Sequence, residues 1–167
     1  MTSVDRKRFD LEAYEARALL GPCFVCAFLK GEPGYEHELV YEDADHVAFL
    51  DRWPTLPGKV LVAPKAHVED VVSGFSEEGY IQTMQAVRRV ALAVEEVLTP
   101  ERVYLLSLGS RQGNPHVHWH VAALPPGVPY EEQQFHALMA EHGVADVAPA
   151  EAARIAAELR RRLARRS

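Results

Sequence analysis

Cysteine is scarce in this sequence, with only two among 167 residues. Two cysteines cannot build a disulfide framework, so the fold must depend on burial of its apolar residues, which make up 48 % of the chain. Apolar runs are also short, and none approaches the roughly 18 residues that a membrane-spanning helix needs. The charged opening lacks the apolar stretch of a secretion signal. We therefore expect a cytoplasmic protein with no membrane partner.

Positive charge is in short supply as well. Lysine and arginine total 18 against 24 acidic residues, a net charge of −6. A dedicated nucleic-acid binder needs surplus basic residues for phosphate contacts, so we expect no nucleic-acid partner. The exception is the stretch from Arg154 onward, which has six arginines and one glutamate. Ile155, Leu159 and Leu163 follow helical spacing there, and two interpretations stay open: a docked or solvated amphipathic helix, or an arm that attracts phosphates.

Periodicity and turn residues predict an α+β fold. Short strands around one long crossing helix favour an antiparallel sheet of about five strands, with extra terminal helices. Helices are predicted over 10–20, 76–98, 131–142 and 151–166, strands over 38–41, 47–50, 59–63, 102–108 and 116–124, and a tight turn over 22–26. We expect one domain over 22–126, with an N-terminal helical extension over 1–21 and a C-terminal helical extension over 127–167 that packs on the domain.

Histidine is abundant, with eight residues, and three of them alternate at His116, His118 and His120. Side chains alternate across a strand, so these imidazoles share one face while Val117 and Trp119 point to the other. From the residues alone, a solvated row, a metal site and a catalytic site are all open. Catalysis is favoured because an imidazole acts as nucleophile, base or acid near neutral pH.

Two motifs carry a resemblance to a known family. The run from His116 to Ala122 resembles the motif of the histidine-triad (HIT) family, in which three histidines alternate with apolar residues. The runs 47–51 and 56–67 resemble the family's second signature, a strand, a nucleotide-holding loop and a strand ending in Pro-Lys-x-His. The resemblance covers roughly residues 23–125. It implies a nucleotide-binding protein with the HIT fold, and a homodimer joined at the long helix and the adjacent strand.

The resemblance also implies a reaction. By similarity, His118 attacks the α-phosphate and forms a nucleotidyl-histidine that water then cleaves, while His120 holds phosphoryl oxygens or transfers a proton. The family's phosphorylase and uridylyltransferase branches generally have glutamine at the position of His120, so hydrolysis is favoured over transfer. The expected substrates are dinucleoside polyphosphates or nucleoside phosphoramidates.

Further residues fall on substrate-binding positions of the family. Asp51 matches the ribose-binding carboxylate, although it also reads as a turn residue. Gln112 and Asn114 precede the triad as candidate polar groups near the leaving group. Arg52 and Trp53 are candidates for the base pocket, with loop surface as the alternative.

Lys59 departs from the family pattern, which usually has histidine after Pro-Gly. A lysine facing the phosphate keeps a positive charge but loses the acceptor nitrogen of an imidazole. The substitution is expected to change leaving-group handling or substrate preference. The alternative is an exposed lysine at the start of a strand.

The two cysteines, Cys23 and Cys26, have the spacing that lets both thiolates reach one zinc ion. On their own they leave a redox pair and two buried thiols open. The resemblance supplies two further ligands, His67 and His116, and so implies a closed, structural zinc site. The remaining four histidines are predicted to be ordinary surface or turn residues: His37, His46, His136 and His142.

Two other functions compete with the nucleotide hydrolase. One is a nucleotide-binding module with little turnover, which the departure at Lys59 favours. The other is a zinc hydrolase in which the histidines hold an open metal that activates water.

Overall fold

The computed structural model describes residues 4–165. Its centre is a five-stranded antiparallel sheet in the order β2-β3-β4-β6-β5, which confirms the predicted α+β fold. The strands are β2 (Leu39–Glu42), β3 (His46–Leu50), β4 (Val60–Pro64), β5 (Arg102–Ser107) and β6 (Trp119–Leu124). No helix among the described residues is long and apolar enough to cross a membrane.

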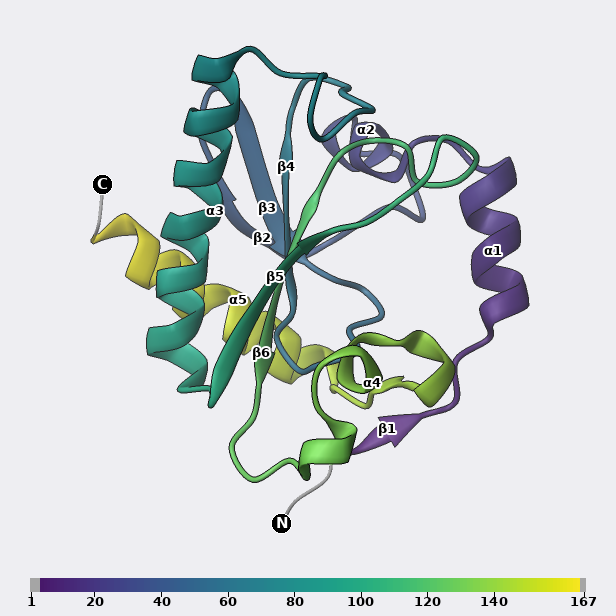
Figure 1. Cartoon of the computed structure of the whole chain (residues 1–167), viewed down its shortest axis with the longest axis vertical. Coiled ribbons are helices and arrows are strands. Elements are labelled where there is room, and N and C mark those ends of the chain that lie inside the picture. Colours follow the sequence, from purple (N-terminus) through teal and green to yellow (C-terminus); the bar gives the residue numbers. More distant parts are fainter. Residues whose placement is uncertain (1–3, 166–167) are drawn as a thin grey trace.

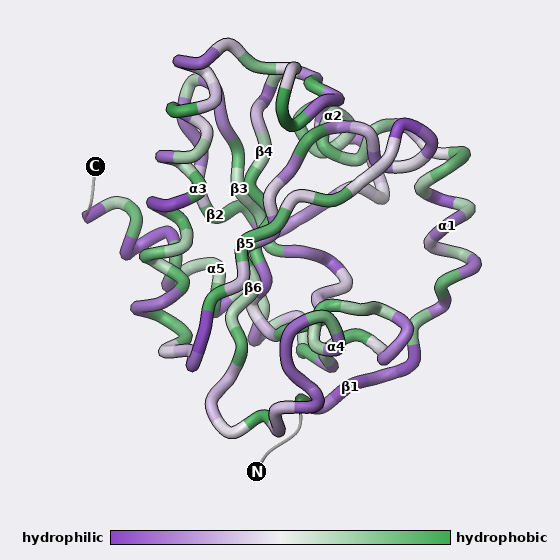
Figure 2. The backbone as a smooth tube through the Cα atoms, in the orientation of Figure 1, coloured by the Kyte–Doolittle hydropathy of each residue, from purple (hydrophilic) through white to green (hydrophobic). Residues whose placement is uncertain are grey.

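Two amphipathic helices cover one face of the sheet, α3 (Glu77–Leu98) and α5 (Pro149–Ala164), as Figure 1 shows. The strands are largely hydrophobic, whereas these helices alternate between hydrophobic and hydrophilic (Figure 2). Ile155, Leu159 and Leu163 are each at most 3 % exposed and pack in the main core. The arginine-rich helix is therefore docked on the domain, as the first of the two sequence interpretations holds.

Shorter elements cover the opposite face. The helix α2 (Phe24–Leu29) packs on Val47 and Phe49 of β3 and on Leu61 of β4. Ala48 and Leu50 of β3 face the α3–α5 side. Strand β3 is buried at all five positions because both faces of the sheet are covered. The site described below lies on this second face.

A strand before α1 (Leu11–Leu20) and a strand before α5 pair in a second, two-stranded sheet. The strand β1 (Arg6–Lys7) pairs antiparallel with β7 (Val144–Ala145), and the Arg6 guanidinium also donates to the carbonyls of Gly143 (2.9 Å) and Ala137 (3.1 Å). The helix α1 follows β1 and lies on the far side of the sheet from α3 (Figure 1). The division into 1–21, 22–126 and 127–167 stays a prediction.

Three predicted elements differ from the structure. The predicted turn at 22–26 is wrong, because Cys23 caps α2 by accepting from the Cys26 amide. The strand predicted from residue 116 begins only at Trp119, since the Val117 amide donates to Val68 (2.7 Å) outside the sheet. The helix predicted over 131–142 is three short pieces, since Gln134 has a φ of 54° that interrupts a helix. These pieces are η1 (Tyr130–Glu132), α4 (Phe135–Leu138) and η2 (Ala140–His142).

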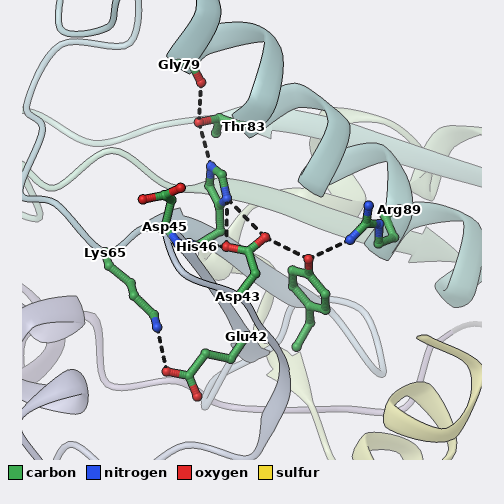
Figure 3. Close-up of polar contacts among 9 residues, drawn as sticks. Glu42, Asp43, Asp45, His46, Lys65, Gly79, Thr83 and Arg89 are labelled. Atoms are coloured by element: carbon green, nitrogen blue, oxygen red, sulfur yellow. Dashed lines mark hydrogen bonds and ion pairs between the residues drawn. The ribbon is translucent and has the colours of Figure 1, made fainter. Parts of the chain in front are cut away.

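A buried histidine ties the β2–β3 turn to α3 (Figure 3). His46 is only 6 % exposed, so of the two predicted roles the surface one is wrong, whereas the residue does close the turn. Its Nδ1 lies 3.1 Å from an Asp43 carboxylate oxygen, and its Nε2 lies 3.0 Å from the Thr83 hydroxyl, which itself donates to the Gly79 carbonyl. Since that hydroxyl has one proton, it accepts from His46.

The Asp43 carboxylate, at the other end of this series of hydrogen bonds, accepts from several donors. Asp43 accepts from the Tyr41 hydroxyl (2.7 Å) and from the amides of Asp45 and His46, and Arg89 donates to Tyr41 in turn. Burial opposes ionisation of Asp43, but these hydrogen bonds outweigh it and lower the pKa of its carboxyl.

Two threonine variants test how much the hydrogen bond between His46 and Thr83 contributes to stability. Thr83→Val removes a bonded hydroxyl and leaves His46 Nε2 without an acceptor, so the free energy of unfolding should fall by about 1–2 kcal/mol. Thr55→Val is the matched control, because the Thr55 hydroxyl is buried with no hydrogen-bond partner among the described residues. Its removal should leave stability unchanged or raise it. Urea unfolding measures both, and equal losses would show that the link to α3 contributes nothing.

Candidate functional site

The triad segment is extended, with its apolar and histidine side chains on opposite sides as predicted. Val117, Trp119 and Val121 belong to the main core against α3. His118 and His120 line a pocket on the other face of the sheet, whereas His116 points into the cysteine cluster described below. The three imidazoles therefore divide between two neighbouring sites.

His118 is held in one tautomer by the backbone. Its Nδ1 lies 2.8 Å from the His116 carbonyl, which can only accept, so Nδ1 carries the proton and Nε2 keeps its lone pair. The ring meets Phe24 edge-on at 5.1 Å between centroids, and Ser107 donates to the His118 carbonyl (2.7 Å). Burial lowers the pKa of His118, which favours the neutral ring. A neutral imidazole with a bare Nε2 is the form that acts as a nucleophile.

His120 lies beside it, with the two ring centroids 4.9 Å apart. Its Nε2 is buried and has no hydrogen-bond partner among the described residues. Burial, reinforced by the charge of Lys59, lowers the pKa of His120 to about 3. A buried ring nitrogen without a partner is costly unless a ligand or water supplies one.

Asp51 and Lys59 form an ion pair of 2.8 Å in the same pocket, with side chains only 15 % and 9 % exposed. Lys59 is therefore not an exposed strand-start lysine. Burial raises the pKa of Asp51, but the Lys59 charge and hydrogen bond outweigh it, and the pKa lies below its usual range. Asp51 also accepts from the Trp53 amide (3.0 Å), so it is a turn residue and a pocket residue at once.

The remaining predicted substrate residues are only partly brought together. Arg52, Trp53 and Asn114 line the pocket with the histidines. Gln112 is exposed and does not line it. Its role near a leaving group stays a prediction, as do the roles of the other residues.

Sequence reasoning missed a group of pocket residues from the N-terminal segment and the following loop. The Tyr14 hydroxyl accepts a hydrogen bond from the side-chain amide of Asn114 (3.0 Å), and its ring packs edge-on against Trp53. The available signal was the helix predicted over 10–20, because helical spacing places Tyr14 on the apolar face of that helix. The spacing does not indicate which part of the molecule this face contacts. The missed lining residues include Phe9, Tyr14, Arg17, Tyr35 and His37.

The four predicted zinc ligands meet at one point. Their ligand atoms, two sulfurs and two ring nitrogens, all lie within 4.8 Å of one another. Cys23 Sγ is 3.4 Å from His116 Nδ1, and Cys26 Sγ is 3.4 Å from His67 Nδ1 and 3.6 Å from His116 Nδ1. Sulfur and nitrogen ligands of one tetrahedral zinc lie about 3.5 Å apart, so the spacing fits this ion.

The outer contacts of both histidines fit a metal as well. The other ring nitrogen of His116 donates to the Pro64 carbonyl (2.8 Å), and that of His67 lies 3.0 Å from the Glu69 carboxylate. Each contact fixes the proton on Nε2 and leaves Nδ1 bare toward the sulfurs, as histidine ligands of metals are held. A simple pair of free thiols would not need two oriented imidazoles.

Comparison with known proteins gives the same family. The family model of the HIT domain matches residues 32–126. An uncharacterized HIT-like protein of Saccharolobus solfataricus is 33 % identical over 103 residues, which cover 59 % of this chain and 71 % of that protein. An adenosine 5′-monophosphoramidase (HINT3) of Danio rerio is 31 % identical over 106 residues, covering 60 % of this chain and 64 % of that protein.

A solved structure extends the comparison to the fold. A zinc-bound histidine triad family protein from Mycobacterium smegmatis is similar with a TM-score of 0.65 and 26 % identity, over 86 % of this chain and 94 % of that one. The family match, the order of strands in the sheet and the cysteine–histidine cluster all indicate the same family. This chain belongs to the HIT domain family, in its branch with a Cys-x-x-Cys pair.

Proposed function

We propose that this protein is a nucleotide hydrolase that cleaves at the α-phosphate through a nucleotidyl-His118 intermediate. The observation that supports it most is the hydrogen bond from His118 Nδ1 to the His116 carbonyl, which presents a bare Nε2 to a pocket lined by His120, Asp51 and Lys59. The activity in the name of the Danio rerio relative, a monophosphoramidase, is of this reaction class.

In this mechanism His118 Nε2 forms a bond to the α-phosphorus while the bond to the leaving group breaks. A phosphate leaving group departs as an anion, whereas an amine departs after taking up a proton from solvent. Water then forms the new P–O bond, the Nε2–P bond breaks, and the water proton passes to solvent. Splitting one displacement into two lowers each barrier.

The other pocket residues are assigned roles by their chemistry. The buried nitrogen of His120 is a hydrogen-bond partner for phosphoryl oxygens, which supply what it lacks in the structure. Lys59 contributes positive charge beside it, and its ion pair holds Asp51 as a carboxylate that can accept from ribose hydroxyls.

Hydrolysis in ¹⁸O-labelled water tests the proposed reaction. Incubation with adenosine 5′-phosphoramidate and with a dinucleoside polyphosphate should release AMP that carries the label, because water attacks the α-phosphorus. With the dinucleoside polyphosphate, label in the other product would mean attack at another phosphorus and would overturn the assignment. Saturable nucleotide binding with no product would favour a binding module instead.

Zinc is proposed as a structural ion held by Cys23, Cys26, His67 and His116. When bound, it would cross-link α2, the segment after β4 and the segment before β6, next to His118. Four protein ligands leave no open position for water, so the donor set argues against a zinc hydrolase.

We also propose that the protein forms a homodimer. Strand β5 is an edge of the five-stranded sheet, and Leu105 within it and Leu108 just after it are 48 % and 62 % exposed. A free strand edge with apolar side chains is suited to pairing with a second copy. Light scattering should give about twice the chain mass of 18.6 kDa; a monomer at micromolar concentration would refute it.

A further inference from the structure

The segment that precedes the HIT domain match forms part of the pocket wall. The match begins at residue 32, yet Phe9, Tyr14 and Arg17 line the pocket together with His118. The pairing of β1 with β7 fixes where this segment starts, and α1 then passes along the pocket. Residues outside the family match therefore line the same pocket as His118 and His120.

Two arginines on this wall converge on one carbonyl. Arg17 from α1 and Arg52 from the loop after β3 both donate to the Gly34 oxygen, at 2.5 and 2.7 Å. The Arg17 guanidinium lies 4.0 Å from the centroid of the Tyr35 ring, and Arg52 lies 5.4 Å from that of Trp53. Stacking and the shared acceptor hold both planar groups in place without neutralising them.

Neither guanidinium forms a salt bridge with a carboxylate in the part of the chain that the structure describes, although the charge of Arg52 attracts the exposed Glu36 carboxylate. Asp51 is paired with Lys59, and the exposed Glu36 carboxylate accepts from the Gly34 amide (3.0 Å). Each arginine uses one of five donors on Gly34, so most donors are left for a ligand. Two like charges held near one carbonyl repel each other, and an anion between them would offset that repulsion.

We propose that Arg17 and Arg52 form an anion subsite for a second phosphate of the substrate, separate from the α-phosphate at His118. This proposal rests on the proposed function and narrows its substrate class. A nucleotide with further phosphates, such as a dinucleoside polyphosphate, fills the subsite. A phosphoramidate with an uncharged leaving group leaves it empty. Half of the subsite comes from outside the family match.

Binding of tripolyphosphate tests the subsite without any turnover. We compare calorimetric affinities of the wild-type chain, Arg17→Gln, Arg52→Gln and Arg8→Gln. Loss of one charged hydrogen-bonding group should raise the Kd about tenfold or more for the first two variants. Arg8→Gln is the matched control, since Arg8 is exposed in the same segment and does not line the pocket; its Kd should stay within twofold. Arg17→Lys keeps the positive charge but loses the planar, forked donors of the guanidinium, so its Kd should lie between those of the wild type and Arg17→Gln.

A selectivity ratio gives the second readout. We expect kcat/KM for a dinucleoside polyphosphate, divided by that for adenosine 5′-phosphoramidate, to fall about tenfold in Arg17→Gln. An unchanged ratio together with an unchanged tripolyphosphate Kd would overturn the subsite, even if the enzyme turns over both substrates. Absence of turnover in the wild type would instead refute the proposed function, and the binding experiment would still decide on the subsite.

Discussion

His118→Asn should lower kcat by about 10⁴-fold or more, because removing a covalent nucleophile eliminates the two-step route. Asparagine keeps a donor for the His116 carbonyl, so the local backbone need not change. Rapid denaturing quenching at alkaline pH, with nucleotide labelled at the α-phosphate, measures the intermediate directly, because a P–N bond to histidine survives base and is hydrolysed in acid. The wild-type chain should carry an acid-labile nucleotide adduct, and the variant should carry none.

His142→Asn is the matched control for this experiment. His142 is exposed and stacks on His136 outside the pocket lining, so the substitution makes the same chemical change away from the site. Its turnover and adduct should equal those of the wild type. Full activity in His118→Asn, with the adduct still present, would move the nucleophile to another residue.

Cys26→Ser should have the largest effect on stability. The wild-type chain is expected to purify with one zinc ion, and the variant with almost none, because serine is a poor zinc ligand. A structural zinc stabilises the fold outright; we expect a loss of about 3 kcal/mol or more. For a chain of this size that corresponds to a fall in Tm of about 6–12 °C. Elemental analysis and thermal unfolding measure the two quantities.

A chelator separates the metal from the side chain. It should lower the Tm of the wild type and of His142→Asn, and should leave the Tm of Cys26→Ser unchanged. A wild-type chain purified without chelator that contains no zinc, and whose Tm does not respond to added zinc, would show that the cluster is a pair of thiols beside two histidines.

The parts that local pattern dictates could be predicted from the sequence. Alternation at 116–121 placed the valines and Trp119 in the core, and the helical spacing of Ile155, Leu159 and Leu163 predicted the docked face of α5. The Cys-x-x-Cys spacing suggested a metal, but alone it left redox chemistry open. Only the family resemblance brought in His67 and His116, which lie 41 and 90 or more residues away in sequence from the cysteines they contact.

The parts that depend on distant contacts could not be predicted. Nothing near Gln134 in the sequence indicates the left-handed backbone that divides the predicted helix; its amide instead donates to the Tyr104 hydroxyl, thirty residues away. Likewise, Lys59 is buried because Asp51 lies across the strand pair to receive it. The contribution of Tyr14 and Arg17 to the pocket follows from tertiary packing alone.

The pairing of β1 with β7 has a consequence for synthesis on the ribosome. Arg6 emerges before the whole HIT domain match, but its partner Ala145 follows 139 positions later. Until β7 has left the ribosomal exit tunnel, β1 has no partner strand to hold the start of α1 in place. The whole family domain is already outside the tunnel by then. A nascent chain can thus fold around His118 before its substrate pocket has all of its walls.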